Sequence, residues 1–340
     1  MGEAGERALI LHMGRHKTGT STLQRYLLQQ RAHLRDHGVE ASAVGAKKDG
    51  RANNLLARAC NDEMAAGHAQ RREEYRADLA AEFAALAPGQ RLLVTSEGFQ
   101  NANPAHVARL FPRPLQLVVY LREQFSYLLS SYCQIVHNQA VSLDVADYAA
   151  RHFDADYTAF LDAWAAALPD ASWTVRVYDR ERLLGGDICR DFMHAIGLPF
   201  AAADTTGRDA DQNPSIGGAI LEFKRRLNST PFGDIIAPKV LYLLLQEVAR
   251  AHPELNRGVH FPAELAQQLR ARYRASNAAL ARRWFAPGQA LFEYREVAPV
   301  DPQMLTAPAL QQVAAALDGQ REGLGSALAG LMRERGAWPD

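Results

Sequence analysis

The chain has 340 residues, of which 48% are hydrophobic and 22% charged, and 38 Lys and Arg residues balance 38 Asp and Glu residues. A chain of this length and composition can bury one large core, so we expect a single elaborated domain over residues 1–340. The balanced charge excludes a general attraction to nucleic acid or to an anionic membrane, so an anion site must be local.

The lengths of the hydrophobic runs and the spacing of the cysteines indicate in which cellular compartment we expect the protein. The first apolar run, Ala8–Met13, is too short for a secretory signal or a membrane span, and no later run approaches about eighteen residues. The three cysteines, Cys60, Cys133 and Cys189, show neither a disulfide framework nor a CxxC metal spacing. We therefore expect a cytoplasmic protein without stable membrane insertion, with reduced thiols and no metal site.

Short apolar runs alternate with helical patterns in the first half of the chain. Ala8–Met13 is continuously apolar and ends at Gly14, which predicts a buried strand, and apolar positions from Leu23 to Leu34 predict a helix after it. Further strands are predicted at 91–95, 115–121 and 173–178, with helices at 50–87, after Pro104 and after Arg122. This alternation predicts an α/β fold with a central, mostly parallel sheet flanked by helices.

The second half of the chain is almost wholly helical in pattern. We divide the expected domain into an α/β core at 8–185, a helical part at 186–285 that packs on the core, and a C-terminal extension at 286–340. Several prolines precede an Ala- and Leu-rich helix in that extension, and no function is predicted for it.

A loop with two glycines, Gly14-Arg-His-Lys-Thr-Gly-Thr-Ser, joins the first strand to the first helix. In this setting backbone N–H groups and the helix N-terminus converge on an anion, while Lys17 adds a positive charge and the hydroxyls add donors. The loop therefore predicts a phosphate cradle, to which His16 can add a donor. The residues assigned to the cradle are Arg15, Lys17, Thr18, Gly19, Thr20 and Ser21.

The order of residues in this loop differs from that of a nucleoside-triphosphate P-loop, GxxxxGK(S/T). Gly14 and Gly19 keep the spacing, but Lys17 precedes the second glycine and Thr20 stands where the P-loop has its lysine. The P-loop lysine reaches the β- and γ-phosphates and the following Ser or Thr holds magnesium. A kinase or phosphotransferase is therefore an alternative interpretation and not the favoured one.

A second candidate segment follows the strand at 115–121. Arg122 ends the strand and can fork onto a phosphate, and Ser130 lies about two helical turns later, off the apolar stripe, where it can meet the same anion. A surface salt bridge is the alternative role for Arg122. Gln134 and His137 share the helix face of Ser130 and are candidates for contact with an acceptor, with an exposed helix face as the alternative.

The third candidate is Glu97, just after the strand at 91–95. A carboxylate beside a bound nucleotide can take the proton of an attacking hydroxyl, so we predict Glu97 as the general base. Capping a turn or orienting Lys17 are the alternative roles, and His16 or His137 are alternative bases. His12, on the first strand, is interpreted as a core histidine with a hydrogen-bond partner.

Together these segments resemble the PAPS-dependent sulfotransferases, which use 3′-phosphoadenosine 5′-phosphosulfate (PAPS). The string HKTGTS resembles their 5′-phosphosulfate loop, approximately (P/K/H)K(S/T)GT(T/S), and Arg122 with Ser130 resembles the pair that holds the 3′-phosphate. Several branches place a catalytic His or Glu where Glu97 stands. The likeness is to a bacterial branch related to the carbohydrate enzymes, and it extends over roughly residues 8–285.

The resemblance implies a P-loop-like sulfotransferase fold and in-line transfer of a sulfuryl group from PAPS, without a metal, to a hydroxyl or amine of a small-molecule or glycan acceptor, including a glycolipid. Lys17, Glu97 and His16 are the implied catalytic residues. The sequence contains no clear match near its C-terminus to the RKGxxG segment of the better-known cytosolic branch, so the adenine contacts are unassigned. A non-catalytic nucleotide-binding protein is the second alternative.

Overall fold

The computed structural model describes residues 6–62, 68–138, 140–202 and 215–339. The chain forms two compact units, and each draws on several stretches of sequence. The first unit comprises Met1–Glu123, Asp156–Thr205 and Ala275–Glu293, and the second comprises Gln124–Ala155, Thr206–Arg274 and Tyr294–Asp340. Because one folding domain can contain more than one compact unit, the predicted single domain stays a prediction.

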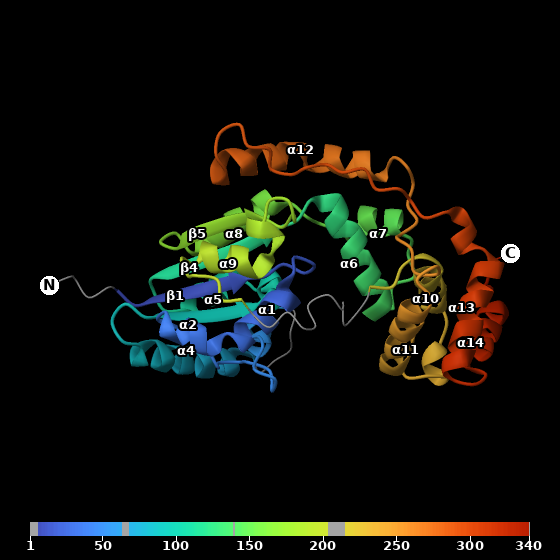
Figure 1. Ribbon diagram of the computed structural model, residues 1–340, viewed down its shortest axis with the longest axis horizontal. Helices are drawn as coiled ribbons and strands as arrows, with labels where there is room; N and C mark the ends of the chain where they lie inside the picture. Colours follow the sequence, from blue (N-terminus) through green and yellow to red (C-terminus); the bar gives the residue numbers. More distant parts are fainter. Residues whose placement is uncertain (1–5, 63–67, 139, 203–214, 340) are drawn as a thin grey trace. The chain divides into compact units, whose positions relative to one another are not determined.

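The first unit is built on a five-stranded sheet in the order β2-β3-β1-β4-β5, in which every neighbouring pair is parallel (Figure 1). This confirms the predicted α/β class and the parallel sheet. The strands are β1 (Ala8–Met13), β2 (Val39–Ala41), β3 (Arg91–Ser96), β4 (Leu115–Leu121) and β5 (Ser172–Val177). The sequence analysis missed β2, because three residues are too few to show a strand pattern.

The strand β1 occupies the centre of the sheet, between β3 and β4. Its residues Leu9, Ile10 and Leu11 are fully buried, as expected for a parallel strand with helices on both faces. His12 is buried as well: its Nδ1 lies 2.8 Å from the hydroxyl oxygen of Thr95, and burial lowers its pKa to about 3. The prediction of a core histidine with a partner is thus confirmed.

Helices cover both faces of the sheet. On one face α1 (Thr20–Gln29) packs against α9 (Ile188–Ala195), and Leu23 and Phe192 meet Ile10 of the sheet in one apolar cluster. In this strand order, right-handed crossovers are expected to place α4, α5 and α8 on the other face, and α5 packs against both α4 and α8. Their bounds are His68–Ala85, Pro104–Leu110 and Tyr157–Ala167.

Two predicted helices are interrupted in the structure. The helix expected from Leu23 to Leu34 is split at Gln30 into α1 and α2 (Arg31–Asp36). The segment expected to be helical at 50–87 contains α3 (Asn54–Ala59) and then α4. Short 3-10 turns complete the unit at η1 (Glu97–Asn101) and η2 (Leu184–Gly186).

The second unit is helical. It contains α6 (Gln124–Asn138), α7 (Val145–Arg151), α10 (Gly218–Leu227), η3 (Phe232–Asp234), α11 (Pro238–Ala251), η4 (Pro302–Leu305), α13 (Ala307–Gln320) and α14 (Leu324–Glu334). The long helix α12 (Leu265–Trp284) contributes residues to both units. No helix in the described ranges is long and apolar enough to cross a membrane.

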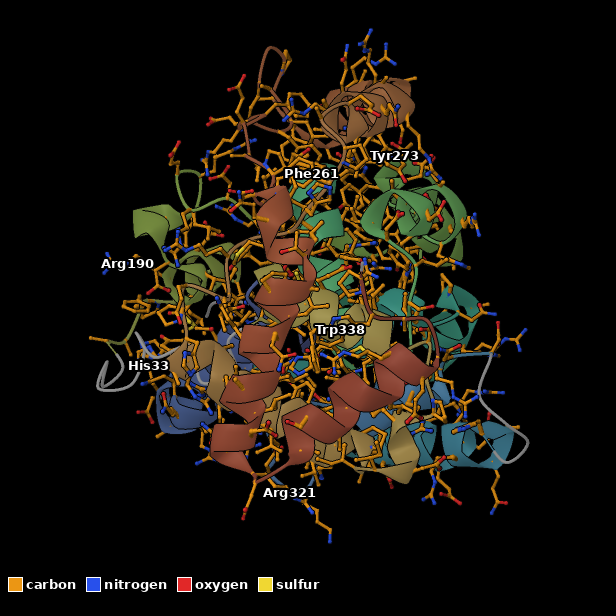
Figure 2. The ribbon with its side chains drawn as sticks, turned by 90° about the vertical axis from the view of Figure 1, so that its right-hand side faces the viewer. His33, Arg190, Phe261, Tyr273, Arg321 and Trp338 are labelled. Carbon is orange, nitrogen blue, oxygen red and sulfur yellow. The ribbon has the colours of Figure 1, made fainter. Side chains whose placement is uncertain are left out.

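The C-terminal helices α13 and α14 pack side by side in the second unit (Figure 2). Trp338, labelled in Figure 2, places its ring edge-on to Phe223 of α10, with 6.4 Å between ring centroids. The two helices approach closely at Gly325, where a Cβ atom would lie 1.9 Å from the carbonyl oxygen of Ala314. Glycine is therefore required at this crossing.

We predict that Gly325→Ala destabilises the protein by about 1–3 kcal/mol, because the added methyl group forces α13 and α14 apart. Gly330→Ala is the matched control on the same helix, since nothing lies within 4 Å of its added Cβ. The control should stabilise by about 0.5–1 kcal/mol through helix propensity. Urea unfolding measures both, and equal gains for the two variants would contradict the close crossing.

Candidate anion-binding site

The candidate site lies at the carboxyl edge of the sheet in the first unit. The connection that leaves β1 leads toward β2 on one side, whereas the connection that leaves β4 leads toward β5 on the other. Open α/β sheets bind ligands at such a switch point. Lys17 follows β1 and Arg122 follows β4, so both predicted basic residues come from the two strands that flank this point.

The backbone of the loop after β1 is unusual. Lys17 has a φ of 64°, and it is the one non-glycine residue with positive φ among those the structure describes. Gly19 follows with a φ of 73° and precedes the first residue of α1, Thr20. Left-handed residues next to helical ones turn successive N–H groups toward one point, which makes an anion-binding concavity. A lysine held there costs about 1–2 kcal/mol, and such strain is concentrated at functional sites.

Arg122 holds this strained loop. Its Nη1 donates a hydrogen bond of 2.9 Å to the carbonyl oxygen of Lys17, and its own carbonyl accepts from the hydroxyl of Tyr157 at 2.7 Å. Burial lowers the pKa of the guanidinium, which nevertheless remains charged. This contact with the loop is not the surface salt bridge considered as an alternative. Binding of a phosphate by Arg122 stays a prediction.

Tyr178 is a member of the site that sequence reasoning missed. It follows β5, and its ring centroid lies 5.9 Å from Cζ of Arg122. A Cβ atom on Gly19 would lie 2.8 Å from the same ring. Since Tyr178 ends a predicted strand, the rule that carboxyl ends of parallel strands gather at one edge was the signal that could have found it.

Glu97 begins η1 directly after β3 and lies beside the loop. A Cβ atom on Gly14 would lie 3.1 Å from Cα of Glu97, so the two backbones are in close contact. The carboxylate is half-buried and its Oε2 accepts a hydrogen bond of 3.0 Å from Nε2 of Gln24 on α1. The turn is capped by Ser96, whose hydroxyl accepts from the N–H of Gly98, so Glu97 is not its cap. Gln24 was not predicted.

Neighbouring charged residues shift the pKa of His16 in opposite directions. Burial is the main reason that the pKa of His16 is lowered; Arg15 and Lys17 lower it further, and Glu97 opposes them. A neutral imidazole can accept a proton, so His16 and Glu97 are two candidate bases within electrostatic reach of one another. Their assignment stays a prediction.

The other predicted loop residues maintain the shape of the loop. The guanidinium carbon of Arg15 lies 4.8 Å from the ring centroid of Tyr157 and 4.6 Å from that of Phe160, both on α8. Thr18 donates its hydroxyl proton to the carbonyl of Arg15 at 2.7 Å. Thr20 is buried and Ser21 is exposed. Contact between these residues and a nucleotide stays a prediction.

The three predicted residues on α6 belong to the second unit, whereas Arg122 belongs to the first. Ser130 and Gln134 are half-buried, and their roles in binding stay predictions. His137 is buried: it donates from Nε2 to the carbonyl of Tyr242 at 3.0 Å, stacks on that ring, and burial lowers its pKa to about 4. The alternative of an exposed helix face is therefore wrong for His137.

Comparisons with known proteins add little to this geometry. No family model matches the chain, and no solved structure matches it. A protein of Archaeoglobus fulgidus described as uncharacterized is 31% identical over 141 residues, which cover 40% of this chain and 38% of the relative. The match thus spans well under half of either protein. Within the ranges described above, no group of three or more His, Cys, Asp or Glu side chains is placed to hold a metal ion.

We predict that Gly19→Ala destabilises the protein more than Gly38→Ala. Both glycines have left-handed backbones, with φ of 73° and 74°, but nothing lies within 4 Å of a Cβ on Gly38. Gly38→Ala should cost about 1–2 kcal/mol for the backbone alone. Gly19→Ala should cost about 1–3 kcal/mol more because its methyl group meets Tyr178. Urea unfolding of both variants checks this, and equal losses would mean that Tyr178 does not pack on the loop.

Proposed function

We propose that this chain is a PAPS-dependent sulfotransferase, which moves the sulfuryl group of PAPS to a hydroxyl or amine of an acceptor. One observation carries the proposal: Lys17, placed between two glycines, adopts a left-handed backbone after the central strand, and Arg122 binds its carbonyl oxygen. A loop that only caps a helix requires neither the lysine nor the strain.

The proposed reaction assigns one role to Lys17 and another to Glu97. The acceptor oxygen or nitrogen attacks sulfur while the bond between sulfur and the 5′-phosphate oxygen breaks. Glu97 takes the proton of the acceptor, and Lys17 stabilises the negative charge that develops on the leaving oxygen. The leaving group is 3′-phosphoadenosine 5′-phosphate (PAP). The remaining N–H groups of Arg122 bind its 3′-phosphate in this proposal.

The geometry around Glu97 supports its role as the base. Gln24 donates to Oε2, which fixes the orientation of the carboxylate and leaves Oε1 to meet the acceptor. The capping role is filled by Ser96. Glu97 also lies directly against the backbone of the loop at Gly14, which keeps it close to the proposed cradle.

We expect PAP, without magnesium, to raise the melting temperature of the protein in a thermal-shift assay, whereas ATP with magnesium should not. A ligand at one hundred times its Kd stabilises the folded state by about 2.7 kcal/mol, which corresponds to a shift of several degrees. Lys17→Ala should remove most of the shift.

A response to magnesium ATP alone would instead support a phosphotransferase. A second assay, transfer of labelled sulfate from PAPS to a panel of acceptors, separates an enzyme from a nucleotide-binding protein.

We predict that Glu97→Gln lowers kcat by roughly 10²- to 10⁴-fold and leaves the affinity for PAPS nearly unchanged, because a general base acts in the transition state. Glutamine keeps an oxygen that can accept from Gln24, so the turn should retain its shape. The measurements are sulfate transfer to an acceptor identified in the panel and PAP binding by calorimetry. His16→Asn is the companion variant: if it abolishes transfer while Glu97→Gln remains active, the base is His16.

A further inference from the structure

A small cavity of about 240 Å³ lies between α4 and α5 in the first unit, and its polar lining is basic. Arginines contribute three of its side chains, Arg72, Arg76 and Arg109, and His106 contributes an imidazole. Leu110 supplies apolar surface, and Glu73 is the one carboxylate that lines the cavity. The chain as a whole has no net charge, so this basic concentration is local.

Helix geometry brings the four basic side chains together. Arg72 and Arg76 are four residues apart on α4, and His106 and Arg109 are three residues apart on α5, so each pair shares one helix face. The helices α4 and α5 pack against one another. The two basic faces therefore converge on the same small volume.

The existing contacts of these side chains leave donors for a ligand. Arg76 binds Glu73 at 2.8 Å through Nε, and Arg72 donates through Nη1 to the carbonyl of Ala59 at 3.0 Å. Each guanidinium has five N–H groups, so these contacts use a minority of them. His106 binds Asp62 at 2.7 Å. The lining thus holds three arginines and one carboxylate, Glu73, and Asp62 lies beside it against His106.

The cavity is connected to the turn that carries Glu97. The chain runs from Glu97 through η1 into α5, whose N-terminus is capped by Asn103. The side-chain amide of Asn103 donates to Asp62 at 2.6 Å, and the other oxygen of Asp62 binds His106. The candidate base and the basic cavity are therefore positioned by one continuous segment at the carboxyl end of β3.

We propose that this cavity binds a carboxylate or sulfate group of the acceptor, and hence that the acceptor is an acidic glycan. This inference rests on the proposed sulfotransferase function. Arginine forks match planar carboxylates and sulfate esters, which offer several acceptor oxygens. The volume is below the roughly 300 Å³ at which pockets for whole ligands begin, so it suits one charged sugar of a longer chain whose reactive group lies at Glu97.

The test uses the full chain and a hexasaccharide of alternating uronic acid and N-acetylhexosamine, with its carboxyl-reduced neutral counterpart. We expect calorimetry to show binding of the acidic hexasaccharide and at least about tenfold weaker binding of the neutral one. The double variant Arg76→Ala with Arg109→Ala should weaken the acidic ligand about tenfold or more, since each charge-assisted contact is worth more than a neutral one. Arg72 is left intact because it also holds Ala59.

Arg71→Ala is the control for lost charge on the same helix. Arg71 pairs with Glu74 at 2.9 Å much as Arg76 pairs with Glu73, but it does not line the cavity. It should change the affinity less than twofold. No binding of the acidic hexasaccharide, or equal affinity in the double variant and the wild type, would overturn the proposal.

The same samples separate this inference from the proposed function. PAP should still raise the melting temperature of the double variant, because Arg76 and Arg109 are not part of the cradle. If PAP has no effect on any sample while the acidic hexasaccharide binds through these arginines, the sulfotransferase proposal fails and the anion site remains. If PAP binds and the hexasaccharide does not, the acidic acceptor alone is wrong.

Discussion

The hydrogen bond from Arg122 to the carbonyl of Lys17 is the contact on which the candidate site depends. It joins the loop after β1 to the end of β4, and so fixes a left-handed lysine against the adjacent strand. A backbone in this conformation persists only when its surroundings over-determine it. Tyr178, packed at the position where Gly19 has no side chain, supplies a second constraint from β5. The loop is thus held from two strands of a rigid parallel sheet.

The carboxyl edge of the sheet holds both a positively charged loop and two candidate proton acceptors, His16 and Glu97. Burial lowers the pKa of His16, and the positive charges of Arg15 and Lys17 in the loop lower it further. Glu97 opposes the effect on His16, and its own carboxylate accepts a hydrogen bond from an uncharged amide, Gln24. The candidate acid-base groups and the cationic loop thus lie side by side at this edge of the sheet.

Sequence patterns predicted the α/β class, four of the five strands and the loop after β1, because long apolar runs and glycine spacing report directly on burial and backbone freedom. The three residues of β2 carry no such periodicity. In the candidate site, Arg122 and Glu97 were singled out because they lie just after predicted strands, and Lys17 because it lies between two glycines in the loop after the first strand. Gln24 was missed because its role depends on contacts across the fold. The burial of His137 was missed for the same reason, since Tyr242, which covers it, is far away in sequence.

The helix α1 has two attachments to the candidate site. Its N-terminus follows Gly19 in the proposed anion cradle, and Gln24, one turn further along the same helix, donates to the carboxylate of Glu97. A helix moves as a stiff rod on the scale of one turn. Under the proposed function, a displacement of α1 toward a bound anion would therefore reach the carboxylate of Glu97 through the hydrogen bond from Gln24.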